Sequence, residues 1–296
     1  MRIRYAILGA ILILVSVKTV KGENVHDPNT DAFVAEFYNN FVSIQSNKAV
    51  KEKIERLIEK HPQNPHLYGF WASVEWTLIG RELGLKANEV MNISKNQKYA
   101  QRLTIYKQML ERGFNQVEND NLLEAVLLFE RGKLEYRFLG DLRGADKTSA
   151  EIVRKLSNES SCHKYFFLGS IRFSMSTQGK IQQFAIYMLS ENYKELQKLD
   201  NDVFSKDKSM EWLELAYKCP YDALSRKIWI DNAFFLISAY EIYKKNLSVR
   251  GEMPVLEKEI RVSSVLTAMF PQNTAMIEKH NLVELRHKTL SNYLKR

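Results

Sequence analysis

Residues 119–158 have the sequence NDNLLEAVLLFERGKLEYRFLGDLRGADKTSAEIVRKLSN, which predicts two helices joined by a tight turn. The first helix is expected at about 121–138 and the second at about 142–156, with Gly140 and Asp141 between them. Two amphipathic helices bury their apolar faces only when further elements pack on either side. The stretch therefore predicts a fold of stacked helix pairs.

Apolar residues recur at helical spacing along most of the remaining chain. The pattern predicts further helices at about 31–46, 49–60, 66–83, a long one ending near 113, and at 162–175, 181–199, 209–219, 222–245, 255–269 and 274–294. Gly251 and Pro254 are expected in a loop, because proline disrupts a helix interior. The run 233–240 fits a buried strand in isolation, but its apolar pattern continues for more than 20 residues without a turn. The sequence therefore predicts an all-α protein.

Residues 1–22 resemble a secretory signal peptide. Arg2 and Arg4 precede the apolar run 6–17, and Val20-Lys21-Gly22 fits a signal-peptidase site. The run is shorter than the roughly 20 apolar residues of a membrane span, so an uncleaved anchor and a buried helix are the less favoured alternatives. We expect cleavage after residue 22, a flexible start at 23–30 and a helical domain at 31–296. The protein is then periplasmic or secreted, with membrane attachment only through an uncleaved signal.

Composition and charge exclude several classes of protein. A hydrophobic content of 45%, with only 12 Gly and 6 Pro, is typical of a folded helical chain and not of a disordered one. The net charge is +8, and residues 1–22 contribute four basic residues and no acidic ones. The rest of the chain has 39 basic and 35 acidic residues, a net charge of +4. This balance is mild and no Lys/Arg block is present, so nucleic-acid binding is not expected.

Cys162 and Cys219 are the two cysteines of the sequence. An exported protein enters an oxidising compartment, where two cysteines can pair. Cys162 is expected to open one helix and Cys219 to end its antiparallel partner, so both would lie at one end of the pair. A disulfide and two free thiols both stay open at this point.

Few residues have metal-binding potential. His280, Glu284 and His287 share one helix face, but neither an HExxH spacing nor a cysteine set accompanies them. We therefore expect a solvated polar face and no metal.

Catalytic patterns are also scarce. His163 follows Cys162 directly, and adjacent helical residues do not face each other. Glu75 and Asp231 lie among apolar residues and are candidates for buried carboxylates with raised pKa values. No GxSxG, glycine-rich phosphate loop or Walker pattern occurs, so the sequence predicts neither catalysis nor a cofactor.

Gly69, Gly132 and Gly169 each fall inside the first helix of a predicted pair. Glycine costs about 1 kcal/mol in a helix interior relative to alanine, so we expect close approach of the paired helix at these positions. Together with the Gly140-Asp141 turn, Ala145 and the Pro-x-Asn segments at Pro62 and Pro271, these glycines resemble the tetratricopeptide-repeat-like (TPR-like) proteins of bacterial cell envelopes. The resemblance covers about residues 31–294. Spacings of 63 and 37 residues between the glycines depart from the usual period of about 34, and the helix at 181–199 looks inserted between 162–175 and 209–219.

The resemblance implies a right-handed α-solenoid of antiparallel helix pairs that binds a protein or peptide in a concave groove, without catalysis. The first helix of each pair would line that groove with residues near its glycine. These are His66, Phe70, Ser73, Phe129, Lys133, Tyr136, Arg137, Phe166, Ser170 and Phe173, with Tyr243 in the fourth pair. Lys133 and Arg137, one turn apart, would attract an acidic segment. Two other functions stay open: a hydrolase acting on envelope polymers such as peptidoglycan, and a helical carrier of a small apolar ligand.

Overall fold

The computed structural model describes residues 28–85, 90–221, 225–245 and 247–295. Within these ranges the chain forms thirteen α-helices and one π-helical segment, and no strand. They are α2 (Pro28–Asn39), α3 (Ile44–Lys60), α4 (Pro65–Glu82), α5 (Gln97–Phe114), α6 (Asn121–Leu134), η1 (Glu135–Leu139), α7 (Leu142–Leu156), α8 (Lys164–Ser176), α9 (Lys180–Leu189), α10 (Glu191–Leu199), α11 (Lys206–Lys218), α12 (Arg226–Lys244), α13 (Val249–Met269) and α14 (Thr274–Leu294). The predicted all-α class is confirmed for this part of the chain. The expected signal peptide lies outside the described residues, and no helix within them is long and apolar enough to cross a bilayer.

Local capping side chains fix several helix starts where the sequence predicts them. Gly140 turns the chain with φ +63°, a conformation that glycine adopts readily, and Asp141 then accepts a hydrogen bond from the N–H of Gly144 at 2.8 Å. Asn273 caps α14 in the same way, through the N–H of Met276 at 3.0 Å. Helices α7 and α14 therefore have the predicted bounds, 142–156 and 274–294.

Two helices are present where the sequence predicts them at 31–46 and 49–60, but the predicted boundary between them is wrong. Helix α2 begins at Pro28, inside the segment expected to be flexible, and ends at Asn39. The chain then turns, and the Ser43 side chain accepts a hydrogen bond from the N–H of Ser46 to start α3. A local cap thus ends one helix and opens another within a continuous apolar pattern.

The predicted helix at 181–199 is two helices. Ser190 caps α10 by accepting from the N–H of Tyr193 at 3.0 Å, and its hydroxyl donates to Asp146 of α7 at 2.5 Å. Helix α10 packs on α7, whereas α8 packs on α11. The segment is therefore inserted between α8 and α11 as predicted, but it bends at Ser190 to reach α7.

Pro254 lies inside α13 and not in the predicted loop. Ser248 starts this helix by accepting from the N–H of Gly251 at 3.3 Å, six residues before the expected start. The proline removes one backbone donor in the second turn. Glu252, buried beside it, accepts two hydrogen bonds from Arg286 of α14, at 2.5 and 2.8 Å, and ties this first turn to the neighbouring helix.

Helices pack most extensively as α3 with α4, α6 with α7, α8 with α11, and α13 with α14. Gly169 allows close approach in one of these pairs, because a Cβ atom there would lie 3.2 Å from the backbone nitrogen of Leu213 in α11. At Gly69 the close neighbour is Val126 of α6, which belongs to the next pair. Gly132 makes only ordinary contact with Thr148 of α7. The predicted reason for the interior glycines thus holds for Gly169, and for Gly69 with a different neighbour.

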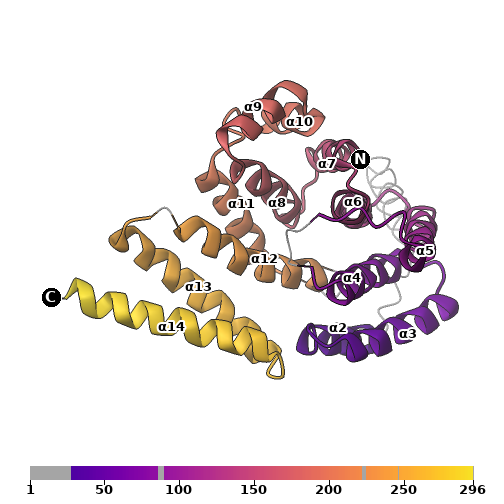
Figure 1. The fold of residues 1–296 in the computed structure, drawn as a ribbon, viewed down its shortest axis with the longest axis horizontal. Coiled ribbons are helices and arrows are strands. Elements are labelled where there is room, and N and C mark those ends of the chain that lie inside the picture. Colours follow the sequence, from indigo (N-terminus) through magenta and orange to yellow (C-terminus); the bar gives the residue numbers. More distant parts are fainter. Residues whose placement is uncertain (1–27, 86–89, 222–224, 246, 296) are drawn as a thin grey trace, which may run out of the picture.

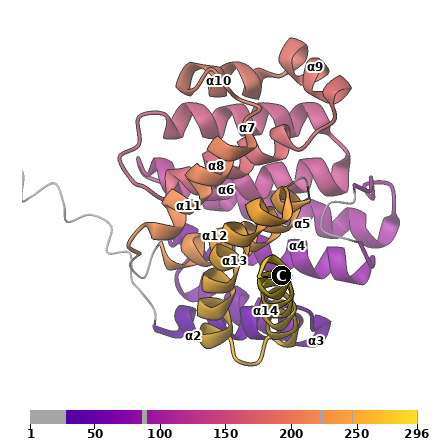
Figure 2. The same cartoon turned by 90° about the vertical axis from the view of Figure 1, so that its left-hand side faces the viewer.

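The first described helix contacts the last pair of helices. Figure 1 shows the helices running in an arc from α2 and α3 through α4 to α11 and returning through α12 to α13 and α14. The Asn273 side chain donates to the backbone oxygen of Tyr38 at 2.7 Å, and the N–H of Gln272 donates to Asn39 at 3.0 Å. In a linear solenoid each repeat contacts only its neighbours. The contact between α2 and the α13–α14 turn, at the bottom of Figure 2, departs from that arrangement.

Candidate functional site

A network of polar side chains joins the helices at the centre of the arc. Ser73 of α4 donates to Glu130 of α6 at 2.7 Å and accepts from Lys227 of α12 at 3.0 Å. Lys227 also pairs with Asp231 at 2.6 Å, and Glu130 pairs with Lys133 at 2.6 Å. Five polar groups from three helices are thereby connected across more than 150 positions of sequence.

Two buried tyrosines complete the network. Tyr38 of α2 donates to Asp231, and Tyr106 of α5 donates to Glu130 at 3.3 Å. Burial, followed by the adjacent carboxylate, raises the pKa of each phenol well above its usual value. Both tyrosines therefore remain neutral donors at physiological pH.

Half-buried side chains cover this network and form the surface that we call the inner face. Its members are Trp76 of α4, Phe129 and Lys133 of α6, and Asp231, Phe234 and Phe235 of α12. The Lys133 ammonium lies 4.8 Å from the Trp76 ring centre and 5.9 Å from that of Phe129. Helix α12 begins beside α4, where Lys227 of its first turn reaches Ser73 (Figure 1).

Buried phenylalanines connect the two sides of the inner face. Phe166 of α8 contacts Phe129 at 5.5 Å between ring centres and Phe235 at 6.3 Å. Phe173 contacts Phe235 at 6.1 Å. Phe166 and Phe173 therefore lie beneath the inner face and not on it.

The other predicted groove residues are dispersed. Phe70 is buried against Phe37 of α2, at 5.8 Å between ring centres. His66 lines a separate cleft beside the two cysteines. Tyr243 donates to Asp207 of α11, and this bond, with burial and the charge of the carboxylate, raises its pKa to about 12. Tyr136 is 44% exposed and continues the stripe of Phe129 and Lys133 by helical spacing.

The proposed cationic pair of Lys133 and Arg137 does not form an open site. Lys133 is bound to Glu130, as described above. Arg137 is buried, with its guanidinium 4.3 Å from the Trp76 ring centre and a hydrogen bond to the backbone oxygen of Leu85 at 3.2 Å. Attraction of an acidic segment by these two residues is therefore not supported.

Sequence reasoning did not identify Glu130, Lys227, Tyr38 or Tyr106 as members of the site. A signal existed for Glu130, because it continues an apolar helix face and only a paired carboxylate is stable there. The tyrosines carried no such signal, since aromatic residues are common in any core.

The two carboxylates singled out by the sequence, Glu75 and Asp231, both have basic partners. Burial of Glu75 would raise its pKa, but hydrogen bonds and charges from Arg102 and Lys51 outweigh that effect and lower the pKa. The prediction of a raised pKa for Glu75 is wrong. Asp231 is half-buried in the inner face and held by Lys227 and Tyr38.

The histidines of α14 also have partners. His280 bonds Ser263 at 2.8 Å, and Glu284 lies 3.3 Å from its other ring nitrogen. His287 lies 3.8 Å from Glu257 of α13. In the described ranges no three or more His, Cys, Asp or Glu side chains are placed to hold a metal ion.

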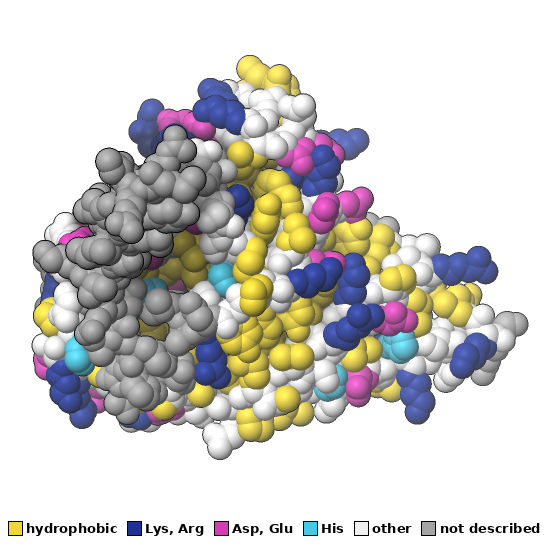
Figure 3. Space-filling view, turned by 180° about the vertical axis from the view of Figure 1, so that it is seen from behind, with side chains coloured by type: hydrophobic (Ala, Val, Ile, Leu, Met, Phe, Trp, Pro, Cys, Tyr) yellow, Lys and Arg dark blue, Asp and Glu magenta, His cyan; other side chains and the backbone are white. Residues whose placement is uncertain are grey.

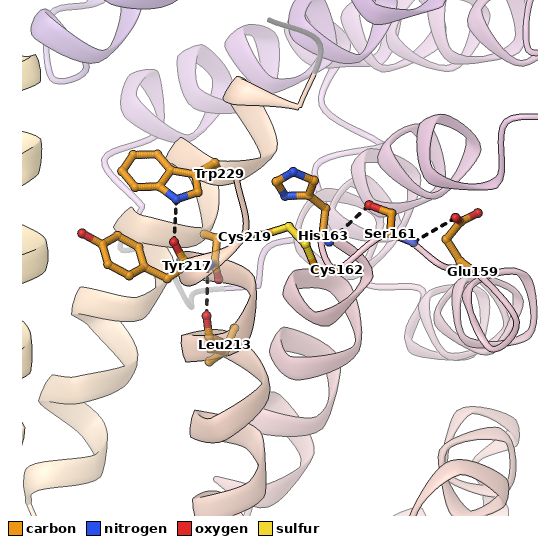
Figure 4. Close-up of a disulfide and its surroundings, with 9 residues drawn as sticks. Glu159, Ser161, Cys162, His163, Leu213, Tyr217, Cys219 and Trp229 are labelled. Carbon is orange, nitrogen blue, oxygen red and sulfur yellow. Dashed lines mark hydrogen bonds between the residues drawn. A yellow bond between two sulfur atoms is a disulfide. The ribbon is translucent and has the colours of Figure 1, made fainter. Parts of the chain in front are cut away.

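Cys162 and Cys219 form a disulfide, with their Cα atoms 5.9 Å apart (Figure 4). The bond joins the segment before α8 to the end of α11, the pair of helices for which the sequence allowed it. Trp229 stacks on Tyr217 close by and donates to its backbone oxygen at 2.7 Å. A cleft of roughly 640 Å³ borders the disulfide, with His66, Asp120, His163 and Tyr221 among its lining residues.

None of the protein-family models, curated proteins or solved structures compared with this chain matches it. The resemblance to TPR-like proteins therefore depends on the residues quoted above and on the paired packing of the helices.

Proposed function

We propose that the protein is a non-catalytic scaffold of the TPR-like kind that binds a protein or peptide segment on its inner face. The observation that supports this proposal is the group of partly exposed aromatic rings at the centre of the arc, Trp76, Phe129, Phe234 and Phe235. Aromatic residues, Phe among them, are enriched in protein interfaces relative to the rest of the surface, and Trp is among the residues that most often dominate binding energy. Because the nearby charges are already paired, the segment is recognised chiefly through its apolar side chains.

The polar network favours binding over hydrolysis. Glu130 and Asp231 are each held by a lysine, and Ser73 receives a hydrogen bond from the Lys227 ammonium. A serine nucleophile needs a neighbouring base that accepts its proton and is free to act. In this network the base candidates are already engaged, so it serves to hold α2, α4, α5, α6 and α12 together beneath the inner face.

We also propose that the protein acts in an exported compartment. The disulfide suits an oxidising space, and residues 1–22 have the pattern of a secretory signal. N-terminal sequencing of exported material should give Glu23 as the first residue, and recovery of Met1 would contradict the cleavage.

The inner face is tested by capturing a partner and then comparing exposed tyrosines. The full-length protein is immobilised and used to isolate a partner from the exported fraction of the source cells. The dissociation constant for the identified partner is then measured. Tyr136→Ala should weaken binding by about 1 kcal/mol or more, since Tyr136 borders the inner face.

Tyr293→Ala is the matched control. Tyr293 is 66% exposed on α14, away from the inner face, so its removal should leave the affinity unchanged. Both variants should keep the melting temperature of the wild type. Equal affinities for the wild type and Tyr136→Ala, or a loss for Tyr293→Ala alone, would contradict the assignment of the inner face.

A further inference from the structure

Helix α9 exposes an unusually dense group of apolar side chains. None of its residues is buried, and five of its ten are large hydrophobic side chains exposed by half or more. These are Ile181 (85%), Phe184 (67%), Tyr187 (52%), Met188 (54%) and Leu189 (79%). A contiguous apolar surface of this kind marks a contact with a partner or a membrane.

Few contacts hold α9 to the molecule. Gln183 donates to the backbone oxygen of Ser176 at 3.2 Å, and the Tyr187 ring meets that of Tyr193 at 5.3 Å. At about 100° per residue, only Gln183 and the half-buried Ile186 face inward, and the apolar side chains cover an arc of roughly 200°. Figures 1 and 2 both place α9 at one extremity of the molecule. The exposed fractions given above show that this arc meets solvent.

The geometry of α9 argues against a protein as its occupant. Ten helical residues are about 15 Å long, too short to supply the roughly 800 Å² per partner that a stable dimer interface buries. A helix that docks in a groove presents a stripe somewhat over 100° wide, with anchors at i, i+3, i+4 and i+7. An arc twice as wide would leave either Tyr187 or Leu189 outside such a groove.

The charges near α9 favour an anionic surface. Residues 160–190 contain no Asp or Glu, and Lys180 is the single charged residue of α9. Two acids lie past the C-terminal end of α9, at the opposite end from Lys180: Glu191 in the first turn of α10, and Asp146 of α7, which accepts from Ser190 and from the N–H of Glu191. Figure 3 shows hydrophobic side chains at this end of the molecule, with both basic and acidic side chains around them.

We propose that α9 inserts into the headgroup region of an anionic lipid bilayer. Its apolar arc enters the boundary with the acyl chains, with Lys180 at the level of the lipid phosphates. The helix lies on the membrane and does not cross it, since 15 Å is half of the hydrocarbon thickness of about 30 Å. This contact is independent of the inner face and leaves that face open to a partner.

Co-sedimentation with lipid vesicles tests the proposal. Full chain is mixed with vesicles of phosphatidylcholine and phosphatidylglycerol in equal parts, and with vesicles of phosphatidylcholine alone. The wild type should bind the anionic vesicles more strongly. The double variant Phe184→Gln/Met188→Gln should partition at least about tenfold less, because two apolar side chains no longer enter the lipid. A second double variant, Ile181→Gln/Leu189→Gln, should show the same loss.

The matched control is Leu282→Gln/Leu285→Gln on α14, where both leucines are more than 60% exposed. It should bind like the wild type, and all proteins compared carry the same N-terminus, so residues 1–22 contribute equally. Lipid binding that is unchanged in both α9 variants would overturn the proposal, as would a wild type that binds neither vesicle. A wild type that self-associates without lipid, with both α9 variants monomeric, would assign the surface to a second copy and also overturn it.

Discussion

At the scale of single residues, Arg137 is a structural side chain and Tyr136 is not. Arg137 is buried between α4 and the π-helical segment, with Trp76 beneath its guanidinium, whereas the adjacent Tyr136 is open to solvent. Arg137→Ala removes a desolvated cation–π contact and the packing of a long stem, and should lower the free energy of unfolding by about 2 kcal/mol or more. Tyr136→Ala should change it by less than about 0.5 kcal/mol. Urea denaturation of both variants measures this difference, and equal stabilities would contradict the burial of Arg137.

Asp200 gives the fold a dependence on acid. Burial would raise the pKa of this carboxyl, but hydrogen bonds from Lys208, the Asp202 backbone and Arg172 outweigh it and hold the pKa well below its usual range. A carboxyl with a depressed folded pKa stabilises the protein above its unfolded pKa of about 4, and this contribution is lost as the pH falls through the folded value. Asp200→Asn should therefore lower the free energy of unfolding by about 2 kcal/mol at pH 7. The loss should become progressively smaller as the pH falls below about 4.

The measurement for Asp200 is the free energy of unfolding of wild type and variant across the acid range. Glu118→Gln is the control, because Glu118 is exposed and has no hydrogen-bond or ion-pair partner among the described residues. A difference between wild type and Asp200→Asn that stays constant from pH 7 to the acid limit would show that the carboxylate charge does not matter.

At the scale of helices, the disulfide fastens α8 to α11 across the inserted α9 and α10. The two cysteines are 57 positions apart, and the chain-entropy model assigns a loop of this length about 4 kcal/mol of stabilisation. The double variant Cys162→Ala/Cys219→Ala should lose an amount of this order in denaturant unfolding. A reducing agent should lower the free energy of unfolding of the wild type to that of the variant, and it should leave the variant's free energy of unfolding unchanged. Two reactive thiols in the native, unreduced protein would contradict the bond.

Helix bounds were predictable from sequence where a glycine or a proline closely precedes the capping residue, and not where a serine caps without one, as at Ser43, Ser190 and Ser248. Gly140 with Asp141, and Asn273 after its proline, act within a few residues, so α7 and α14 were predicted correctly. The break at Ser190 depends on Asp146, 44 positions earlier, which no local pattern reveals. The early start of α13 depends likewise on Arg286 of α14 holding Glu252, while Pro254 argued locally for a loop.

At the scale of the whole molecule, the inner face was predictable only in part. Phe129 and Lys133 follow from helical spacing around Gly132 and from the TPR-like resemblance. Their meeting with α12 depends on the return of the chain, in which Tyr38 reaches Asp231 from 193 positions away. Long-range closure of this kind has no periodic signature, and a resemblance to linear repeats predicts that the ends stay apart.

The closure is tested through two asparagines that share a sequence context. Asn64 and Asn273 both follow Pro-Gln, and each caps a helix with its side-chain oxygen, through His66 and Met276 respectively. Asn273 alone also donates to the backbone oxygen of Tyr38 in α2. Aspartate preserves the cap in both places but has no N–H to donate, so Asn273→Asp leaves a buried carbonyl facing a carboxylate. Asn273→Asp should lower the free energy of unfolding by about 1–3 kcal/mol.

Hydrogen exchange measures the effect on α2. It should show reduced protection of the α2 amides in Asn273→Asp and wild-type protection in Asn64→Asp. If α2 is equally protected in both variants, the contact between α2 and the α13–α14 turn does not hold the fold closed in solution.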